Sequence, residues 1–280
     1  MTYKCLSIAG FDGSGGAGIQ ADLKTFSALS CYGMNVLTAI PVQNTQGVRS
    51  CYELPLSCVE EQLQAIFDDV RPDAIKIGML FTAPIIELVA EFLSFHATDI
   101  PIVLDPVMVA KSGDYLLKAD AVEILKKKLF PICDLVTPNL PEAYALVGHQ
   151  EGLEKIGEDL LKLGVKAVLV KGGHDQSLSC DDLLFLPGGR CKHFHSERIN
   201  SKNTHGTGCT LSAAIAALLA QGFSLEGACE VAKDYLFNAI KASKNSSIGL
   251  GHGPVHHFFH LWPTSYSKEH IHLDFSHLGC

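Results

Sequence analysis

The stretch LSIAGFDGSGGAGIQADLKTFSAL, residues 6–29, decides the fold class. It predicts a short apolar strand at residues 6–9, then a glycine-rich loop, then a helix at residues 19–29. A strand that leads through a loop into a helix is the building unit of α/β proteins. We therefore expect a mostly parallel sheet with helices packed on both faces.

The same alternation continues along most of the chain. Strands are predicted at residues 35–40, 74–77, 102–104, 135–136 and 167–170, and helices at residues 59–70, 85–95, 121–129, 153–163, 207–220 and 225–242. Residues 183–198 break this rhythm, because two strand-like stretches flank Pro187, Gly188 and Gly189, which predicts a hairpin. We expect one domain at residues 1–263 and a C-terminal tail at residues 264–280 whose order the sequence leaves open.

The composition excludes several classes of protein. The chain has 280 residues, of which 47% are hydrophobic and 19% charged, and this balance is typical of a globular protein rather than a disordered one. A net charge of −8 argues against a nucleic-acid partner, although backbone N–H groups can still bind phosphate. The chain shows no signal peptide and no apolar run long enough for a membrane. Ten cysteines without a Cys-x-x-Cys pair argue against structural zinc, so we expect a cytoplasmic protein with free thiols.

Polar, glycine or proline residues follow each predicted strand at the point where it ends. Ligands of open α/β sheets bind outside the carboxyl ends of the strands. We therefore expect a binding site along one rim of the sheet, formed by residues 10–18, 43–45, 78–79, 105–108, 137–142 and 171–174.

The first glycine cluster, Gly13 to Gly18, matches the dinucleotide pattern G-x-G-x-x-G. That fingerprint also needs an acidic residue about 20 positions on, which holds a ribose hydroxyl. The next acid after Asp22 is Glu53, so a Rossmann dehydrogenase is disfavoured. A Walker-type phosphate loop is absent from the sequence, which also argues against a P-loop kinase.

The second glycine cluster, residues 204–212, leads directly into an alanine-rich helix. Unpaired N–H groups at a helix N-terminus form an anion hole, which suits phosphate. Thr207 can equally be a plain N-cap, so both interpretations are open at this point. A helix N-terminus can lower the pKa of a cysteine to about 3.5–7.5. Cys209 is therefore either a thiolate base for a substrate hydroxyl or an inert buried thiol.

Asp105 and Glu142 are the carboxylates best placed to bind Mg²⁺, which needs one or two protein carboxylates besides waters and substrate phosphates. Glu142 has a second interpretation, as an acidic residue in the first turn of a helix that begins near Asn139. Histidines gather toward the C-terminus without clear metal-ligand spacing, and we favour a polar segment over a metal site there: His252, His256, His257, His260, His270, His272 and His277.

These motifs, in this order, resemble a known family over about residues 6–262. They are GGAGIQAD (15–22), QNT (43–45), KIGM (76–79), DPVM (105–108), SG (112–113), TPNLPEA (137–143), KGGH (171–174) and THGTGCTLS (204–212). The chain is similar to the hydroxymethylpyrimidine/phosphomethylpyrimidine kinases of thiamine biosynthesis, in the ribokinase-like superfamily. It departs from their pattern at Gly13, where the family often has proline, and in the tail at residues 264–280. Sugar-kinase relatives carry aspartate where this chain has Cys209, which favours the pyrimidine and pyridoxal branch.

The resemblance implies a three-layer α/β/α fold, a homodimer, and ATP and Mg²⁺ as cofactors. It implies two successive phosphorylations, first of 4-amino-5-hydroxymethyl-2-methylpyrimidine and then of its monophosphate. It further implies the following roles: Gln43 reads the pyrimidine, with Ala17, Met79 and Val107 as its neighbours; Asn139 and Glu142 tune Mg²⁺ and phosphate; Lys171 contacts the ATP phosphates; and Gly206, Gly208 and Cys209 form the anion hole, with Cys209 as catalytic base. Beside these roles we expect Asp105 to be the second metal carboxylate, and Asn139 and Thr207 to contact the nucleotide.

Two alternatives remain at this stage. One is a pyridoxal or pyridoxine kinase, because both substrates are small aromatic nitrogen heterocycles with a hydroxymethyl arm. The other is a pyrimidine-binding protein that has lost turnover. The presence of Asp105, Glu142, Lys171 and Cys209 together argues against the second alternative.

Overall fold

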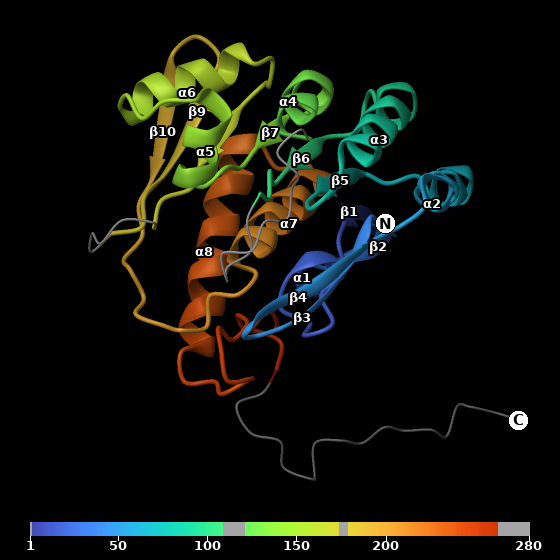
Figure 1. Ribbon diagram of the computed structural model, residues 1–280. Helices are drawn as coiled ribbons and strands as arrows, with labels where there is room; N and C mark the ends of the chain where they lie inside the picture. The colour runs from blue at the N-terminus through green and yellow to red at the C-terminus, as the bar shows by residue number, and fades with distance from the viewer. Residues whose placement is uncertain (1, 109–120, 174–178, 263–280) are drawn as a thin grey trace, which may run out of the picture.

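The central sheet has eight strands, in the order β10-β9-β8-β7-β6-β5-β1-β2 (Figure 1). The computed structural model describes residues 2–108, 121–173 and 179–262. All neighbours from β2 to β8 pair in parallel, whereas β9 and β10 are antiparallel. The mostly parallel sheet is therefore confirmed. Its strands are β1 (Tyr3–Ala9), β2 (Cys31–Leu37), β5 (Ala74–Ile77), β6 (Ile102–Leu104), β7 (Leu135–Val136), β8 (Val168–Val170), β9 (Asp182–Leu186) and β10 (Arg190–Phe194).

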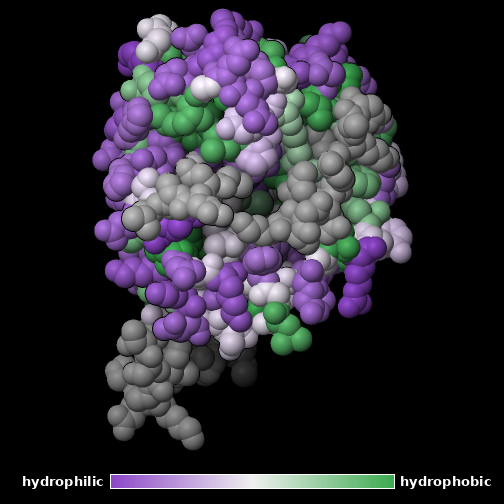
Figure 2. All heavy atoms as spheres, turned by 60° about the vertical axis from the view of Figure 1, so that its left-hand side comes forward, coloured by the Kyte–Doolittle hydropathy of each residue, from purple (hydrophilic) through white to green (hydrophobic). Residues whose placement is uncertain are grey.

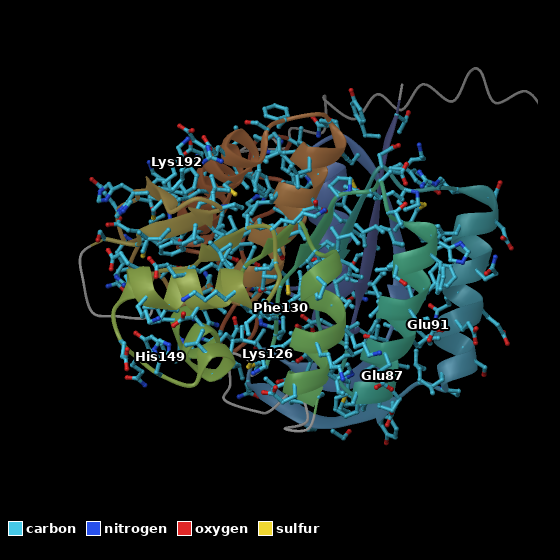
Figure 3. All side chains as sticks on the ribbon, turned by 90° about the horizontal axis from the view of Figure 1, so that it is seen from above. Glu87, Glu91, Lys126, Phe130, His149 and Lys192 are labelled. Atoms are coloured by element: carbon cyan, nitrogen blue, oxygen red, sulfur yellow. The ribbon has the colours of Figure 1, made fainter. Side chains whose placement is uncertain are left out.

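Helices cover both faces of this sheet, which confirms the three layers (Figure 1). Side chains alternate along a strand, so Ile75 packs in one core while Ala74 packs in the other. One core is closed by α1 (Gly18–Ala28), α7 (Thr207–Ala220) and α8 (Leu225–Ser243). The other is closed by α2 (Leu56–Asp69), α3 (Ala83–His96), α4 (Ala121–Ile124), α5 (Leu140–Val147) and α6 (Leu153–Lys162). Glu87 and Glu91 of α3 lie on its solvent-facing side (Figure 3).

The prediction of one strand at residues 35–40 is wrong, because the chain changes sheets there. Thr38 N–H donates to Ala9 O at 3.1 Å, and Thr38 Oγ1 donates to Met79 O at 2.6 Å, where the main sheet ends. Beyond Thr38 the chain forms β3 (Ala39–Asn44), which pairs with β4 (Gly47–Glu53) in a separate antiparallel ribbon. The apolar run at residues 35–40 continues across this junction, so the sequence does not reveal that the chain leaves the main sheet and pairs with β4 instead. The strand β4 was not predicted, since most of its side chains are exposed and polar.

Two further segments refine the predicted elements. The predicted helix at residues 121–129 consists of α4 followed by a π-helical turn, η1 (Leu125–Leu129), and then a 3₁₀ turn, η2 (Phe130–Ile132). The hairpin around Pro187 is confirmed as β9 and β10. Gly188 and Gly189 in its turn have φ angles of 79° and 75°, which only glycine adopts without strain.

Some expectations fall on residues outside this description. The tail at residues 264–280, the Ser112-Gly113 motif and His174 all lie there. Within the described ranges, no helix combines the length and apolarity needed to cross a membrane. The described cysteines are all free thiols. The face seen in Figure 2 is mostly hydrophilic and is hollowed near its centre.

Candidate active site

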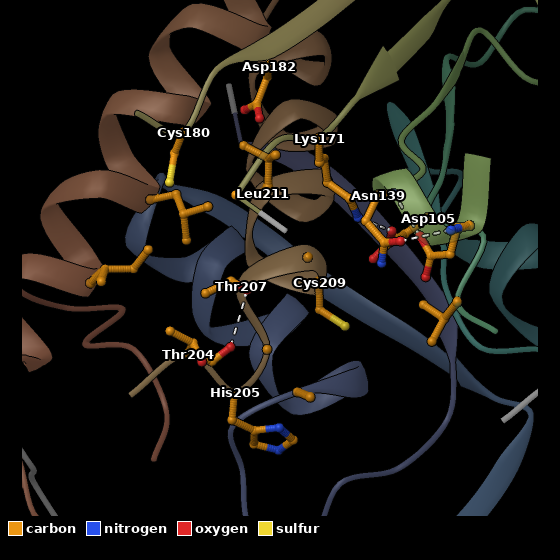
Figure 4. Close-up of a pocket in the computed structure, with 18 of the residues that line it drawn as sticks. Asp105, Asn139, Lys171, Cys180, Asp182, Thr204, His205, Thr207, Cys209 and Leu211 are labelled. Carbon is orange, nitrogen blue, oxygen red and sulfur yellow. Dashed lines mark hydrogen bonds and ion pairs between the residues drawn. The ribbon is translucent and has the colours of Figure 1, made fainter. Parts of the chain in front are cut away.

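One cavity of about 640 Å³ lies at the carboxyl ends of the parallel strands, against the start of α7. This volume falls in the range of about 300–1,000 Å³ that small-molecule sites occupy. Polar and backbone groups from distant segments line it together (Figure 4). All the candidate residues from the sequence are among them: Ala17, Gln43, Met79, Asp105, Val107, Asn139, Glu142, Lys171, Gly206, Thr207, Gly208 and Cys209. The structure therefore brings them to one place, while their individual roles remain predictions.

A lysine and two carboxylates form the charged wall of the cavity. Lys171 Nζ donates to Asp105 Oδ1 at 2.7 Å, and the two side chains are only 11% and 3% exposed. Glu142 lies nearby, because both Lys171 and Asp105 act on its ionisation. Burial raises the pKa of Glu142 to about 7, and the Asp105 charge adds to this, while the Lys171 ammonium opposes it. The two carboxylates thus have only one lysine to balance their negative charge, so this wall of the cavity can bind a further cation.

Asn139 and Glu142 come from the start of α5, where they form a capping box. Glu142 N–H donates to Asn139 Oδ1 at 2.9 Å, and Asn139 N–H donates to Glu142 Oε2 at 2.8 Å. Such a pair satisfies two backbone donors at a helix N-terminus. The helix-start interpretation of Glu142 is therefore confirmed. It is compatible with a ligand role, since both residues also line the cavity.

The start of α7 forms the opposite wall. Gly206 is its N-cap, with φ of 78°, so the interpretation of Thr207 as the N-cap is wrong. Thr207 Oγ1 instead donates to Thr204 O at 3.2 Å (Figure 4). The N–H groups of the first helical turn precede the helix's own hydrogen bonds and can serve an anion.

Gly208 lies directly against the charged wall. A Cβ atom at this position would come within 3.1 Å of Asp105 Oδ2 and 3.2 Å of Lys171 Nζ. Glycine therefore allows the helix backbone to approach the ion pair closely. This close approach places the amides of α7 and the Lys171 ammonium around the same part of the cavity.

Cys209 lines the cavity in the first turn of α7, but its ionisation differs from the prediction. Burial raises the pKa of the Cys209 thiol to about 11. The Lys76 ammonium and the backbone N–H of Gly18 lower it, whereas Asp22 and Asp105 raise it further. The expectation of a lowered pKa is therefore wrong. Burial beside two carboxylates outweighs the Lys76 ammonium and the Gly18 N–H.

Sequence reasoning gave no role to a buried ion pair below Cys209. Lys76 Nζ donates to both Asp22 oxygens, at 2.9 and 2.8 Å, and both side chains are fully buried. Ser7 Oγ donates to Asp22 Oδ2 at 2.5 Å. A lysine in the middle of a strand at the sheet centre was the available signal, because lysine is almost never buried without a partner.

A second ion pair at the far end of the cavity was also missed. Lys233 Nζ, from α8, donates to Asp182 Oδ2 at 2.7 Å and to Cys180 O at 2.6 Å. Asp182 Oδ1 in turn accepts from Gly172 N–H at 2.8 Å, next to Lys171. The pair therefore links α8 to the loop that carries Lys171. Lys233 and Asp182 lie 51 positions apart, so no local pattern announced their contact.

The C-terminal histidines do not assemble into a metal centre among the described residues. No group of three or more histidine, cysteine or acidic side chains there could hold a metal ion. His257 is instead buried, and its Nε2 lies 3.1 Å from Thr210 Oγ1 of α7. His270, His272 and His277 lie outside the described residues.

Comparison with known proteins gives consistent matches over nearly the whole chain. The family model described as phosphomethylpyrimidine kinase matches residues 12–256. The hydroxymethylpyrimidine/phosphomethylpyrimidine kinase of Salmonella typhimurium is 50% identical over 263 residues, covering 92% of this chain and 97% of the relative. The enzyme of the same name from Bacillus subtilis is 42% identical over 261 residues, covering 91% and 95%.

Two solved structures are similar in fold and sequence. The crystal structure of phosphomethylpyrimidine kinase from Clostridium difficile 630 has a TM-score of 0.75 and 42% identity, covering 85% of this chain and 100% of that one. Pyridoxal kinase from Staphylococcus aureus, in complex with AMP-PCP and pyridoxal, has a TM-score of 0.83 and 35% identity, covering 93% and 95%.

Proposed function

Because the chain belongs to the phosphomethylpyrimidine kinase family, we propose that it transfers the γ-phosphoryl group of ATP to 4-amino-5-hydroxymethyl-2-methylpyrimidine. The resulting monophosphate is the acceptor in a second transfer, which yields the pyrophosphate for thiamine biosynthesis. The observation that carries the proposal is the cavity in which the start of α7 faces the Lys171–Asp105 pair. We assign this activity to one kinase domain at residues 1–263 of a cytoplasmic protein.

The acceptor ring is proposed to lie at the β3 side of the cavity. Met79 is 7% exposed and packs in a small apolar cluster with Ala39 and Val107, which suits the face of a flat ring. Gln43 lines the same side, and its amide can both donate and accept hydrogen bonds. An aminopyrimidine presents both kinds of partner along one edge. Ala17 lies across the ring from this cluster in the proposed complex.

The nucleotide phosphates are proposed to lie between Lys171 and the start of α7, with Thr207 and Asn139 beside them. A kinase family requires ATP, and AMP-PCP and ADP occur in complexes of structural relatives. The donor set fits Mg²⁺, because the carboxylates of Asp105 and Glu142 offer oxygen ligands and their two negative charges exceed the one positive charge of Lys171. The raised pKa of Glu142 reflects this lack of positive charge together with burial. When bound there, Mg²⁺ supplies positive charge to the phosphate oxygens and offsets the carboxylate charge beside Cys209.

Cys209 is the proposed base for the first transfer. The thiol first releases its own proton to water, and the resulting thiolate takes the proton of the hydroxymethyl group and becomes a thiol again. The hydroxymethyl oxygen attacks the γ-phosphorus in line while the bond to the ADP oxygen breaks. The amides of Gly206, Gly208 and Cys209 hold charge on the transferring group. Phosphoryl transfer has a loose transition state, so positioning contributes more than a strong nucleophile. The raised pKa keeps Cys209 mainly as the thiol, so its role as base requires bound Mg²⁺, whose positive charge would favour the thiolate.

Release of ADP on adding each heterocycle to the protein with Mg²⁺ and ATP tests the function. We expect release with the hydroxymethylpyrimidine and with its monophosphate. Release with pyridoxal alone would support the pyridoxal kinase alternative, which the S. aureus structural relative favours. Pyrimidine binding without any ADP release would contradict the kinase proposal and support the binding-protein alternative.

Cys209→Ala tests the base. We expect kcat of the first phosphorylation to fall by about 10²–10⁴-fold with little change in KM, because a general base acts on the transition state. The second phosphorylation should suffer less, since its acceptor is already a phosphate. Cys191→Ala is the matched control, as this thiol is exposed on β10. Near wild-type kcat, or equal loss in both steps, would remove Cys209 from this role.

A homodimer is proposed as the assembled form. The β3–β4 ribbon stands apart from the main sheet and exposes Val42 and Tyr52, the latter by 64%. Large exposed apolar side chains close together are typical of an interaction surface. Light scattering should give the mass of two chains, and Tyr52→Asp should reduce it toward one. A monomeric wild-type protein would contradict this assignment.

A further inference from the structure

A buried carboxylate organises the first glycine-rich loop. The Asp12 side chain is fully buried, and its Oδ2 accepts the N–H groups of Gly16 at 3.0 Å and Ala17 at 2.7 Å. Its Oδ1 accepts from both the N–H and the Oγ of Ser14, at 3.0 and 2.7 Å. The loop at residues 13–17 is therefore wound around one anion. Burial raises the pKa of the Asp12 carboxyl, but hydrogen bonds from His205 and Ser14 outweigh this and hold the pKa well below its ordinary value.

A histidine from the second glycine cluster reaches the same carboxylate. His205 Nε2 lies 2.8 Å from Asp12 Oδ2, and the His205 side chain is 14% exposed. His205 directly precedes Gly206, the N-cap of α7, and lies next to the helix start in Figure 4. Its own N–H donates to Gly253 O at 3.0 Å. Gly253 thus fixes the backbone of His205, while the imidazole ring of His205 contacts Asp12 in the first loop.

The backbones of the two loops are in direct contact at this point. A Cβ atom at Gly206 would come within 1.8 Å of Gly16 O, and one at Gly16 within 2.4 Å of His205 Cδ2. Glycine is therefore required on both sides of the contact. The Asp12–His205 pair and these glycines form one junction, to which we refer as the loop junction (Asp12, Gly16, His205 and Gly206).

The loop junction lies between two parts of the cavity that the reaction must align. Ala17 caps α1 on the acceptor side, while Gly206 caps α7 on the phosphoryl side, and both line the cavity. Gly18, the first residue of α1, and Cys209, in the first turn of α7, line the same cavity. A shift of one loop against the other would therefore move the acceptor, Cys209 and the α7 amides out of register.

We infer that Asp12 and His205 are positioning residues, which join the acceptor-side loop to the anion hole and so align the two substrates for transfer. Neither residue needs to touch a substrate for this role. The inference rests on the proposed kinase function. Its effect should appear in kcat and leave KM nearly unchanged, because alignment matters most in the transition state.

His205→Leu removes the ring nitrogen that reaches Asp12. The carboxylate keeps its bonds to Ser14, Gly16 and Ala17, so we expect the variant to fold. We expect kcat to fall by about 100-fold, the loss that a misplacement of about 1 Å can cause. His205→Gln keeps a donor at the end of the side chain and should restore most of kcat.

Gly16→Ala tests the same contact from the opposite loop, because its Cβ would displace the His205 ring. It should lower kcat in the same way. His149→Leu is the control for the histidine. It breaks a comparable pair, with Nε2 3.1 Å from Asp159 Oδ2, at the periphery of the molecule (Figure 3).

The decisive measurement is steady-state kinetics of all variants together with their melting temperatures. A loss of kcat in His205→Leu and Gly16→Ala, with recovery in His205→Gln, supports the inference. Unchanged kcat in His205→Leu, or a rise in KM that accounts for the whole loss, overturns it. If His205→Leu does not fold, wild-type kcat in Gly16→Ala overturns it and a selective loss of kcat supports it. Failure of the function itself is distinguishable, because the wild-type protein would then release no ADP.

Discussion

Two buried lysine–aspartate pairs lie near the centre of the sheet, and they differ in what surrounds them. Lys76 holds both oxygens of Asp22 and Ser7 adds a third bond, with neither charged side chain exposed. Lys171 bonds one oxygen of Asp105, and both face the cavity, where they are 11% and 3% exposed. Lys76 also borders the cavity, but its ammonium is fully buried and already bonded to both Asp22 oxygens, whereas the second pair is partly exposed to a ligand there.

The charge balance of the two clusters explains their different uses. Lys76 and Asp22 form a one-to-one pair inside the core, and a buried pair of this kind needs each partner to compensate the other. Lys171 serves both Asp105 and Glu142, and burial leaves Glu142 with a pKa of about 7. A cluster with surplus negative charge beside a helix N-terminus can take up a cation together with phosphate. We therefore expect the first cluster to govern stability and the second to govern catalysis.

Lys76→Met should give the largest effect and would test this division. Loss of the ammonium leaves Asp22 without its partner in the core, where burial already raises the pKa of this carboxyl. Asp22 must then either stay charged and uncompensated or bind a proton, so we expect the free energy of unfolding to fall by about 3–5 kcal/mol. Urea denaturation measures this loss. The control is Lys162→Met on α6, because that lysine is 64% exposed in its ion pair with Asp159 and should change stability little. A loss similar to the control would mean that the Lys76–Asp22 pair does not hold the core together.

Lys171→Met should affect the reaction more than the fold. We expect kcat to fall by about 10²–10³-fold, as for removal of one donor to transition-state charge. The free energy of unfolding should fall less than in Lys76→Met, because Glu142 can bind a proton and water can reach the cavity side of Asp105. Kinetics and urea denaturation of both variants measure these effects. An equal loss of stability in the two variants would contradict the division between the two clusters.

The pH dependence of Mg²⁺ activation gives a smaller effect and sharpens the comparison. Glu142 has a raised pKa, so it binds a proton below about pH 7 that a metal ion must displace, and no proton competes above that pH. The Mg²⁺ concentration for half-maximal activity should therefore rise as pH falls, approaching about tenfold per pH unit for one displaced proton. Titrations with Mg²⁺ at pH 6, 7 and 8 measure this.

Glu142→Gln is the matching variant for that titration. The variant should need a higher Mg²⁺ concentration for half-maximal activity at every pH. That concentration should also depend less on pH, because the proton that competes with Mg²⁺ at Glu142 is gone. The same slope in the variant and the wild type would assign the proton to another group. A flat profile in the wild type would contradict the placement of Mg²⁺ at Glu142.

Much of the fold was predictable because its signals are local. Strands such as β5 and β6 appear as short apolar runs, and glycines at 188 and 189 mark a turn that requires positive φ. The site was also predictable in position, since strand ends in a parallel sheet meet at one rim. The β3–β4 ribbon was not, because Thr38 changes sheets without any break in the apolar pattern.

The alternation of elements, the glycines at their turns and the set of residues at the strand ends could all be inferred from the sequence. These depend on spacing along the chain and on the conformations that each residue allows. Three features become visible only in the folded chain: His205 contacts Asp12, 193 positions away, Lys76 pairs with Asp22, and the pKa of Cys209 is raised rather than lowered. Burial and charge act through distances in space, and those distances exist only once the sheet has assembled.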